Sequence, residues 1–218
     1  MKLCDVLEIC PGVTAVIGSG GKTTLLQTLA GELSRRGTVL LCTTTKMWLP
    51  ADVPVCHDAN QVCSVLQEQN VVYAGTEDPV QGKLLPPVFQ GWEKLADYVL
   101  VEADGAAGKP LKAHALWEPV LPEERTQTIC VVGASGIGKT IVRSVHRPEI
   151  FAELCGASLR DAASLEKIGA VLKRENLTDR VFLNQMDTAP DHTAEALAEY
   201  LPWPLAAGSL HKEQWRSI

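Results

Sequence analysis

The feature that most constrains this chain is a glycine-rich loop between a predicted strand and a predicted helix. Residues 13–17 are apolar and β-branched, which predicts a buried strand, and the loop Gly18-Ser19-Gly20-Gly21-Lys22-Thr23-Thr24 follows directly. Leucines and alanines then recur at helical spacing over residues 22–36, until Gly37 ends the pattern. The next apolar run, residues 38–42, predicts a second strand, parallel to the first and reached by a right-handed crossover.

The chemistry of this loop suits a phosphate group. Its glycines lack Cβ, so the main chain can wrap closely around an anion, and the start of the following helix attracts negative charge. We therefore expect Gly18–Thr24 to hold a nucleoside triphosphate, GTP or ATP, with Lys22 on the phosphates and Thr23 on Mg²⁺. The match to the Walker pattern is incomplete because Val16 stands where its first glycine belongs. The alternative interpretation is a plain glycine turn before a helix.

A second loop, residues 133–140, matches the Walker pattern in full and also follows a predicted strand. Its context is poorer, because Pro148 limits the helix behind it to about two turns. We expect Lys22, and not Lys139, to belong to the phosphate-binding loop. The second loop is then expected to line the same ligand-binding edge.

The remaining pattern alternates strands and helices. Strands are predicted over residues 71–74, 98–101, 128–132, 180–183 and 204–207, and helices over 58–69, 149–155, 161–174 and 192–200. Residues 75–90 are punctuated by Gly and Pro and predict a segment rich in loops. The expected fold is α/β, a mostly parallel β-sheet flanked by helices in a three-layer P-loop NTPase architecture, with residues 1–218 as one domain.

Two acidic residues follow the predicted strand 98–101. Glu102 and Asp104 lie where P-loop NTPases hold Mg²⁺ directly or through water, so both are candidate metal ligands and, with Lys22, candidate catalytic residues. Which acid acts cannot be decided from the pattern, and a solvated turn rich in Asp and Gly is the alternative.

The segment Asn184-Gln185-Met186-Asp187 resembles the N-K-x-D element with which GTPases read guanine. A carboxylate at Asp187 would accept hydrogen bonds from guanine that adenine does not offer, and Gln replaces the lysine of the pattern. We take Asn184 and Asp187 as base-binding candidates and favour guanine, with adenine still open. The loop at 208–209 is placed to close over the same base.

Two further groups of polar residues are candidates for anion binding. The segment 43–46, Thr-Thr-Thr-Lys, ends a predicted strand and would bring hydroxyls and an ammonium beside the phosphates. A purely structural role for its threonines is equally compatible with the pattern. The second group would suit an anionic acceptor and consists of Lys109, Lys112, His114, His146 and Arg147.

Charge and composition argue against several classes of protein. The net charge is −6, with no basic run, which disfavours nucleic acid and anionic membranes as partners. Neither a signal peptide nor a membrane-spanning apolar stretch is expected. The seven cysteines have no C-x-x-C spacing and are expected to be reduced thiols of a cytoplasmic protein, a metal site at Cys56-His57 being the weaker alternative.

Taken in order, five motifs resemble the YqeC-like proteins: GSGGKTT at 18–24, TTTK-M at 43–47, VEADGAAGKPLKAH at 101–114, HRPE at 146–149 and NQMD at 184–187. That family is regarded as accessory to selenium-dependent molybdenum hydroxylases and to selenium cofactor biosynthesis. The acidic motif also looks like that of the SIMIBI class of P-loop proteins. The resemblance implies a nucleotide-dependent maturation factor, with a molybdenum hydroxylase or a cofactor-handling protein as partner.

The leading hypothesis is therefore an Mg²⁺-dependent nucleoside-triphosphatase that serves such maturation. One alternative is a small-molecule kinase or ligase that uses the triphosphate on an anionic acceptor. Another is a non-catalytic binding module switched by nucleotide. A homodimer is compatible with each.

Overall fold

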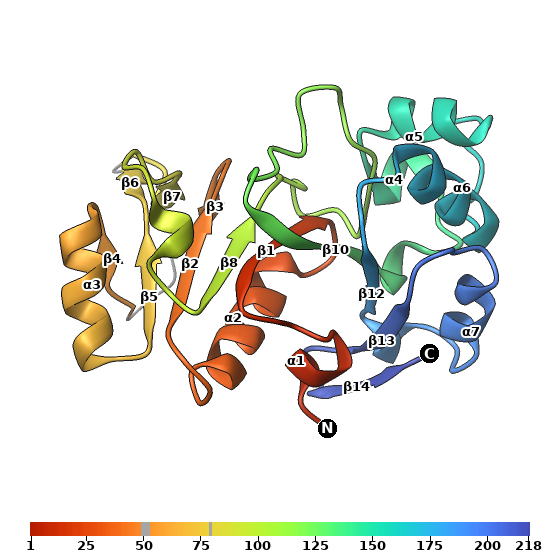
Figure 1. The fold of residues 1–218 in the computed structure, drawn as a ribbon. Coiled ribbons are helices and arrows are strands. Elements are labelled where there is room, and N and C mark those ends of the chain that lie inside the picture. Colours follow the sequence, from red (N-terminus) through yellow and green to blue (C-terminus); the bar gives the residue numbers. More distant parts are fainter. Residues whose placement is uncertain (49–52, 79) are drawn as a thin grey trace.

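A nine-stranded sheet forms the centre of the computed structural model, which describes residues 1–48, 53–78 and 80–218 (Figure 1). All neighbouring strands are parallel except the last pair, β13 and β14. In spatial order the strands are β14 (Gln214–Ser217), β13 (Leu205–Ser209), β12 (Arg180–Asn184), β10 (Arg125–Gly133), β1 (Gly12–Gly18), β8 (Tyr98–Glu102), β2 (Val39–Thr43), β5 (Val71–Ala74) and β4 (Val55–Cys56).

Helices cover both faces of this sheet (Figure 1). One face packs against α1 (Leu3–Val6) and α2 (Lys22–Leu33). The other face packs against α5 (Pro148–Cys155), α6 (Leu165–Glu175) and α7 (Thr193–Ala198) at one end and against α3 (Ala59–Glu68) at the other. The mostly parallel, three-layer α/β architecture predicted from the sequence is confirmed.

Strand β1 illustrates why the sheet is buried on both sides. Successive side chains of a strand point to opposite faces, so an apolar run without alternation supplies both. Val16 packs in the cluster that contains α2, whereas Ala15 and Ile17 pack in the cluster that contains α5 to α7. β1 lies between β10 and β8, so the loop that follows it emerges at the centre of the carboxyl edge.

Two small sheets stand outside the main one. β9 (Leu111–Lys112) pairs with β11 (Val145–His146), and β3 (Met47–Trp48), β7 (Lys83–Leu85) and β6 (Thr76–Asp78) form an antiparallel three-stranded sheet. The prediction of a loop-rich segment over residues 75–90 was therefore wrong for β6 and β7, while Pro79 lies outside the described residues. Strands of three residues are too short to show a periodic pattern.

Other differences concern the ends of elements. The strand predicted over 204–207 is not the last, because β14 follows it and pairs antiparallel with it. Helix α6 begins at Leu165, not at 161, because Ser164 caps it by accepting a hydrogen bond from the Lys167 amide. The remaining short elements are α4 (Ile141–Ser144) and the 3₁₀ turns η1 (Trp92–Lys94), η2 (Ala134–Gly136) and η3 (Met186–Thr188).

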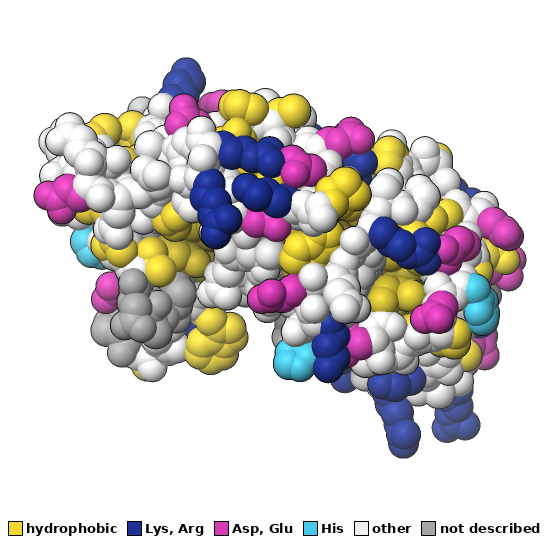
Figure 2. All heavy atoms as spheres, turned by 90° about the horizontal axis from the view of Figure 1, so that it is seen from below, with side chains coloured by type: hydrophobic (Ala, Val, Ile, Leu, Met, Phe, Trp, Pro, Cys, Tyr) yellow, Lys and Arg dark blue, Asp and Glu magenta, His cyan; other side chains and the backbone are white. Residues whose placement is uncertain are grey.

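Charged side chains of both signs occur on the surface, and the helices are short. On the face shown in Figure 2, Lys and Arg side chains are interspersed with Asp and Glu, and they form no continuous basic stripe. None of the helices in the described ranges has the length and apolar character that a bilayer crossing requires. All seven cysteines are free.

Candidate functional site

The glycine-rich loop joins β1 to α2 and makes close contacts on both sides. Gly18, Gly20 and Gly21 have φ angles of +88°, +97° and +126°, values that L side chains rarely adopt. A Cβ on Gly20 would lie 2.6 Å from the Cα of Gly133 on the neighbouring loop. Glycine is therefore needed for the loop to pass this close to the second glycine-rich segment.

The amides of this loop form a cradle. The Gly18 amide donates to Asp104 and the Ser19 amide donates to the Val131 carbonyl, which fixes the base of the loop. The next five amides, of Gly20 through Thr24, have no protein acceptor within the described part of the chain. Such a row of unpaired donors at the start of a helix is suited to a phosphate group.

The second glycine-rich loop has a different structure. Its amides at Gly138, Lys139 and Ile141 donate to backbone carbonyls of Ala163, Gly136 and Asp161, so they are already occupied. Helix α4 behind it has only four residues, and the Lys139 side chain is exposed. This loop lines the same edge of the sheet through Ser135, but its amides around Lys139 are already paired with backbone carbonyls.

Thr23 and Glu102 form the pair that would hold a divalent cation. Glu102 ends β8, next to β1, and its Oε2 accepts a 2.8 Å hydrogen bond from the Thr23 hydroxyl. Burial raises the pKa of Glu102, and the nearby Lys22 ammonium and the Thr23 hydroxyl oppose this rise. A hydroxyl and a carboxylate beside phosphate oxygens are the hard oxygen ligands that Mg²⁺ prefers. A cluster of three His, Cys, Asp or Glu side chains able to bind a metal is absent from the described residues.

Asp104 lies behind this pair, fully buried, at the centre of a charge network. Its Oδ1 faces the Lys22 ammonium at 3.0 Å as an ion pair without a directed hydrogen bond, and its Oδ2 lies 3.3 Å from the Lys112 Nζ. The same Oδ2 contacts His114 Nε2 at 2.7 Å. Burial alone would raise the pKa of Asp104, but His114, Lys22 and Lys112 outweigh it and lower the pKa to about 2. Asp104 thus orders the loop from beneath, and Glu102 is the acid that lines the cavity.

The network extends from Asp104 to the outer helices. His114 Nδ1 lies 2.9 Å from Glu175 at the end of α6, and Lys112 lies 2.9 Å from Glu118, which also pairs with Arg147. Lys112 and His114 are both buried. Their predicted role in binding an anionic acceptor is therefore not supported, because these side chains neutralise buried carboxylates.

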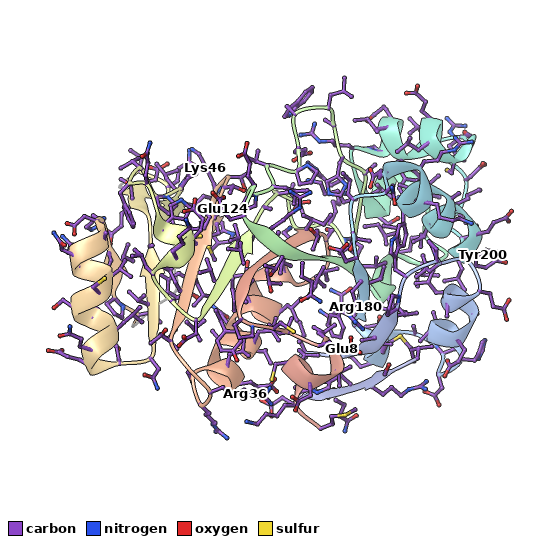
Figure 3. All side chains as sticks on the ribbon, viewed as in Figure 1. Glu8, Arg36, Lys46, Glu124, Arg180 and Tyr200 are labelled. Carbon is purple, nitrogen blue, oxygen red and sulfur yellow. The ribbon has the colours of Figure 1, made fainter. Side chains whose placement is uncertain are left out.

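The threonines that end β2 also have structural partners. Thr43 is fully buried and its hydroxyl donates to the Glu102 carbonyl, while Thr44 donates to the Val120 carbonyl. These hydroxyls therefore hold β8 and the loop before β10 in place. Lys46 is the exposed member of the segment, and in Figure 3 it lies at the other side of the molecule from the Glu8–Arg180 pair.

The Asn184 segment lies on the other side of the glycine-rich loop. The Asn184 side chain donates to the Gly20 carbonyl at 2.7 Å and accepts from the Leu210 amide at 3.0 Å, so it joins this loop to the loop after β13. Gln185 accepts a hydrogen bond from the Ser135 hydroxyl. Asp187 is exposed, and the Ser209 hydroxyl beside it holds the pKa of its carboxyl below the ordinary value.

Two adjoining cavities meet at the glycine-rich loop. One, of about 500 Å³, extends toward Asn184, Asp187 and Ser209. The other, of about 650 Å³, extends past Thr23 and Glu102 toward the three-stranded sheet. Both are lined by Gly20, Gly21, Thr24, Ser135 and Gln185, so the loop forms their common wall.

Comparison with known proteins places this arrangement in a family. The family model described as "YqeC protein" matches residues 14–149. The chain belongs to the YqeC family. A protein of Escherichia coli (strain K12) named "Uncharacterized protein YqeC" is 32% identical over 176 residues, which cover 75% of this chain and 68% of that protein. The family match includes the glycine-rich loop and the Glu102–Asp104 segment, whereas Asn184 and Asp187 lie beyond it.

Among solved structures, the chain is similar to the signal recognition particle 54 kDa protein of Aeropyrum pernix K1 in complex with GDP. The TM-score is 0.43 and the identity 15%, and the match covers 96% of this chain and 44% of that one. The fold of this chain is therefore defined by its own strand order and contacts, as given above.

The site as a whole combines predicted and unforeseen features. Gly20–Thr24, Glu102, Asn184 and Asp187 line the two cavities, whereas Gly18 and Ser19 form the base of the loop. The sequence did not reveal that Asp104 would be covered, nor that Trp48 and Lys83 would join the wall. Trp48 and Lys83 belong to short strands with no functional motif, so no sequence signal could have identified them.

Proposed function

We propose that this YqeC-family protein binds a nucleoside triphosphate together with Mg²⁺ and hydrolyses it. The observation that carries the proposal is the row of amides at Gly20–Thr24 that lack an acceptor among the described residues, beside the hydrogen-bonded pair of Thr23 and Glu102. The amides and the Lys22 ammonium would bind the β- and γ-phosphates, and Thr23 with Glu102 would hold the cation. Bound there, Mg²⁺ would supply charge neutralisation at the phosphate oxygens.

Lys22 has to leave Asp104 to reach a phosphate. In the structure its Nζ lies 3.0 Å from Asp104 Oδ1 and donates to the Gly18 carbonyl at 2.8 Å. Asp104 then keeps Lys112 and His114, so it would act as a positioning residue that holds the loop and the lysine. Glu102, on the cavity wall, would orient the cation or the attacking water.

The base would lie in the 500 Å³ cavity beyond Gly21. Asn184 would hold the glycine-rich loop in place, and Asp187 would face the edge of the base. An ionised carboxylate favours guanine, which presents two N–H donors to it, over adenine. GTP is therefore our first choice of nucleotide, with ATP as the alternative.

At the level of biology, we propose that nucleotide turnover serves the maturation of a selenium-dependent molybdenum hydroxylase in the cytoplasm. Membership of the YqeC family supports this, as does the VEADGAAGKPLKAH segment that builds the centre of the site. A hydroxylase or a cofactor-handling protein would be the partner. If turnover is absent even with that partner, the protein would instead act as a nucleotide-switched binding module.

The first test compares the two glycine-rich loops. Lys22→Ala should weaken GTP and ATP binding by about 100-fold, since a lost charge-assisted contact costs about 1.5–3 kcal/mol. Lys139→Ala is the matched control and should leave binding unchanged, because Lys139 is exposed and its amide already donates to the Gly136 carbonyl. Calorimetric titration with Mg²⁺ measures both, and circular dichroism confirms that each variant folds. The reverse pattern would show that the phosphates bind the second glycine-rich loop, at 133–140, and not the loop of Lys22.

One observation favours a second candidate function, a small-molecule kinase or ligase. The 650 Å³ cavity continues past the phosphate end of the site, where a nucleotide alone would not fill it. Phosphate transfer to, or triphosphate cleavage stimulated by, a small molecule would support this alternative over simple hydrolysis.

A further inference from the structure

The larger cavity has a far end that the nucleotide does not explain. Beyond Thr23 and Glu102 it is walled by Trp48 and Lys83 of the small antiparallel sheet and by Lys46, which directly precedes β3. The cavity of about 500 Å³, in which the base would lie, extends from the glycine-rich loop in the opposite direction. The far end is therefore additional space in a cavity of about 650 Å³, which as a whole is within the size range of small-molecule sites.

This far end is positively charged in a chain whose net charge is −6. Among the described residues, no carboxylate lies within 4.0 Å of the ammonium groups of Lys83 and Lys109. Lys46 has one partner, Asp78, at 3.5 Å, and its side chain is half exposed. Glu102 is the acid of the cavity lining, and it faces Thr23. Lysines that outnumber the acids around a concave surface favour an anion.

Trp48 adds a flat apolar surface to the same wall. Its side chain is 65% exposed, although tryptophan usually buries most of its area. The Lys83 ammonium lies 5.0 Å from the centre of the indole, a cation–π contact that holds both side chains at the cavity wall. An exposed indole next to ammonium groups can stack on a planar ring while the lysines bind its charge.

We propose that this far end is a subsite for a second substrate, an anionic small molecule with a planar ring, held by Trp48, Lys46 and Lys83 next to the phosphate end of the nucleotide. The inference deepens the proposed function, on which it rests for the neighbouring triphosphate. Stacking on Trp48 would orient the ring, and Lys46 and Lys83 would bind a carboxylate or phosphate. Lys109, which donates to the Arg143 carbonyl at 2.7 Å, would form the inner side of the subsite.

The test uses pyridoxine 5′-phosphate as the probe, with pyridoxine and glycerol 3-phosphate as counterparts that lack the anion or the ring. We expect saturable binding of pyridoxine 5′-phosphate in ligand-observed NMR with a Kd of about 1 mM or better, and binding at least about tenfold weaker for either counterpart. Trp48→Ala and Lys83→Gln should each weaken probe binding at least about tenfold. No saturable binding up to about 10 mM, or equal binding of the counterparts, would overturn the proposal.

Matched variants and added nucleotide distinguish the subsite from binding elsewhere on the protein. Trp117 is also highly exposed, at 71%, but lies outside this cavity, so Trp117→Ala should bind the probe like the wild type. The same holds for Lys139→Gln. A saturating, slowly hydrolysed GTP analogue with Mg²⁺ should leave probe binding intact, and competition would mean that the probe occupies the nucleotide site. If nucleotide fails to bind but the probe binding depends on Trp48, the proposed function fails while the subsite stands.

Discussion

At the residue scale, two acids two positions apart have different environments. Glu102 ends β8 with its carboxylate on the cavity wall, whereas Asp104 is covered by Lys22, Lys112 and His114. The sequence presents both as acids that follow an apolar strand. Their environments differ because Lys22, Lys112 and His114 all contact Asp104. These three residues come from the loop after β1 and from residues 112–114, and no local pattern encodes their meeting.

His114 gives the molecule a pH-dependent stability. Burial disfavours its charged form, but hydrogen bonds with Asp104 and Glu175 outweigh burial and raise the pKa of His114 above its ordinary value of 6.5. A raised folded-state pKa stabilises the fold below pH 6.5, and this contribution is lost as pH rises through the folded-state value. The free energy of unfolding, from urea titrations between about pH 6 and 9, should therefore fall with pH.

His114→Gln is the control for this dependence. It should lower stability at pH 6 more than at pH 9, so that the difference between the two proteins shrinks with pH. His146, whose pKa burial lowers, titrates with the opposite sign in both proteins and cancels in that difference. A constant difference across the range would show that folding does not shift the pKa of His114.

In the proposed function, Asp187 would be the residue that favours GTP over ATP. Asp187→Ala should weaken GTP binding by about 10- to 100-fold and ATP binding little, because a hydrogen bond to a charged group is worth about 1.5–3 kcal/mol. Competition titrations of GTP and ATP measure the ratio. Asp191, exposed nearby but outside the cavity of Asn184, supplies the control variant. Equal losses for both nucleotides would remove the argument for guanine.

At the element scale, the close approach of the two glycine-rich loops is open to test. Gly20→Ala would place a Cβ 2.6 Å from the Gly133 Cα at a φ of +97°, so we expect a loss of about 1–3 kcal/mol in stability together with weaker nucleotide binding. Gly138→Ala is the control, since its φ is also positive, at +76°, but nothing lies within 4 Å of the added Cβ. Its cost should be about 1–2 kcal/mol in stability, with nucleotide affinity unchanged. Denaturant titration and calorimetric binding distinguish the two.

Helices and strands with long apolar patterns could be predicted from the sequence, whereas those with short patterns could not. The strand before the glycine-rich loop, α2 behind it and the strands near 98, 128 and 180 all carry long apolar runs. The short sheet of β3, β7 and β6 does not, because its strands have two or three residues and become recognisable only through their pairing. β14 is mostly exposed, so its pairing with β13 left no apolar signal.

At the scale of the whole molecule, one sheet contributes to all three apolar clusters. Each face of the sheet packs on its own helices, and strands β1, β2 and β8 supply side chains to both. We therefore expect residues 1–218 to unfold as one domain. Differential scanning calorimetry should give a single transition whose calorimetric and van't Hoff enthalpies agree. Two resolved transitions would divide the chain into separate units.

The buried charge network has an uneven balance, and this has a consequence for ligand capture. Its three carboxylates face four basic groups when His114 is protonated, namely Lys22, Lys112, His114 and Arg147 against Asp104, Glu118 and Glu175. With His114 protonated, the three basic groups that remain after Lys22 turns away match these three carboxylates. Lys22 can therefore turn toward an incoming polyphosphate without leaving Asp104, Glu118 or Glu175 uncompensated.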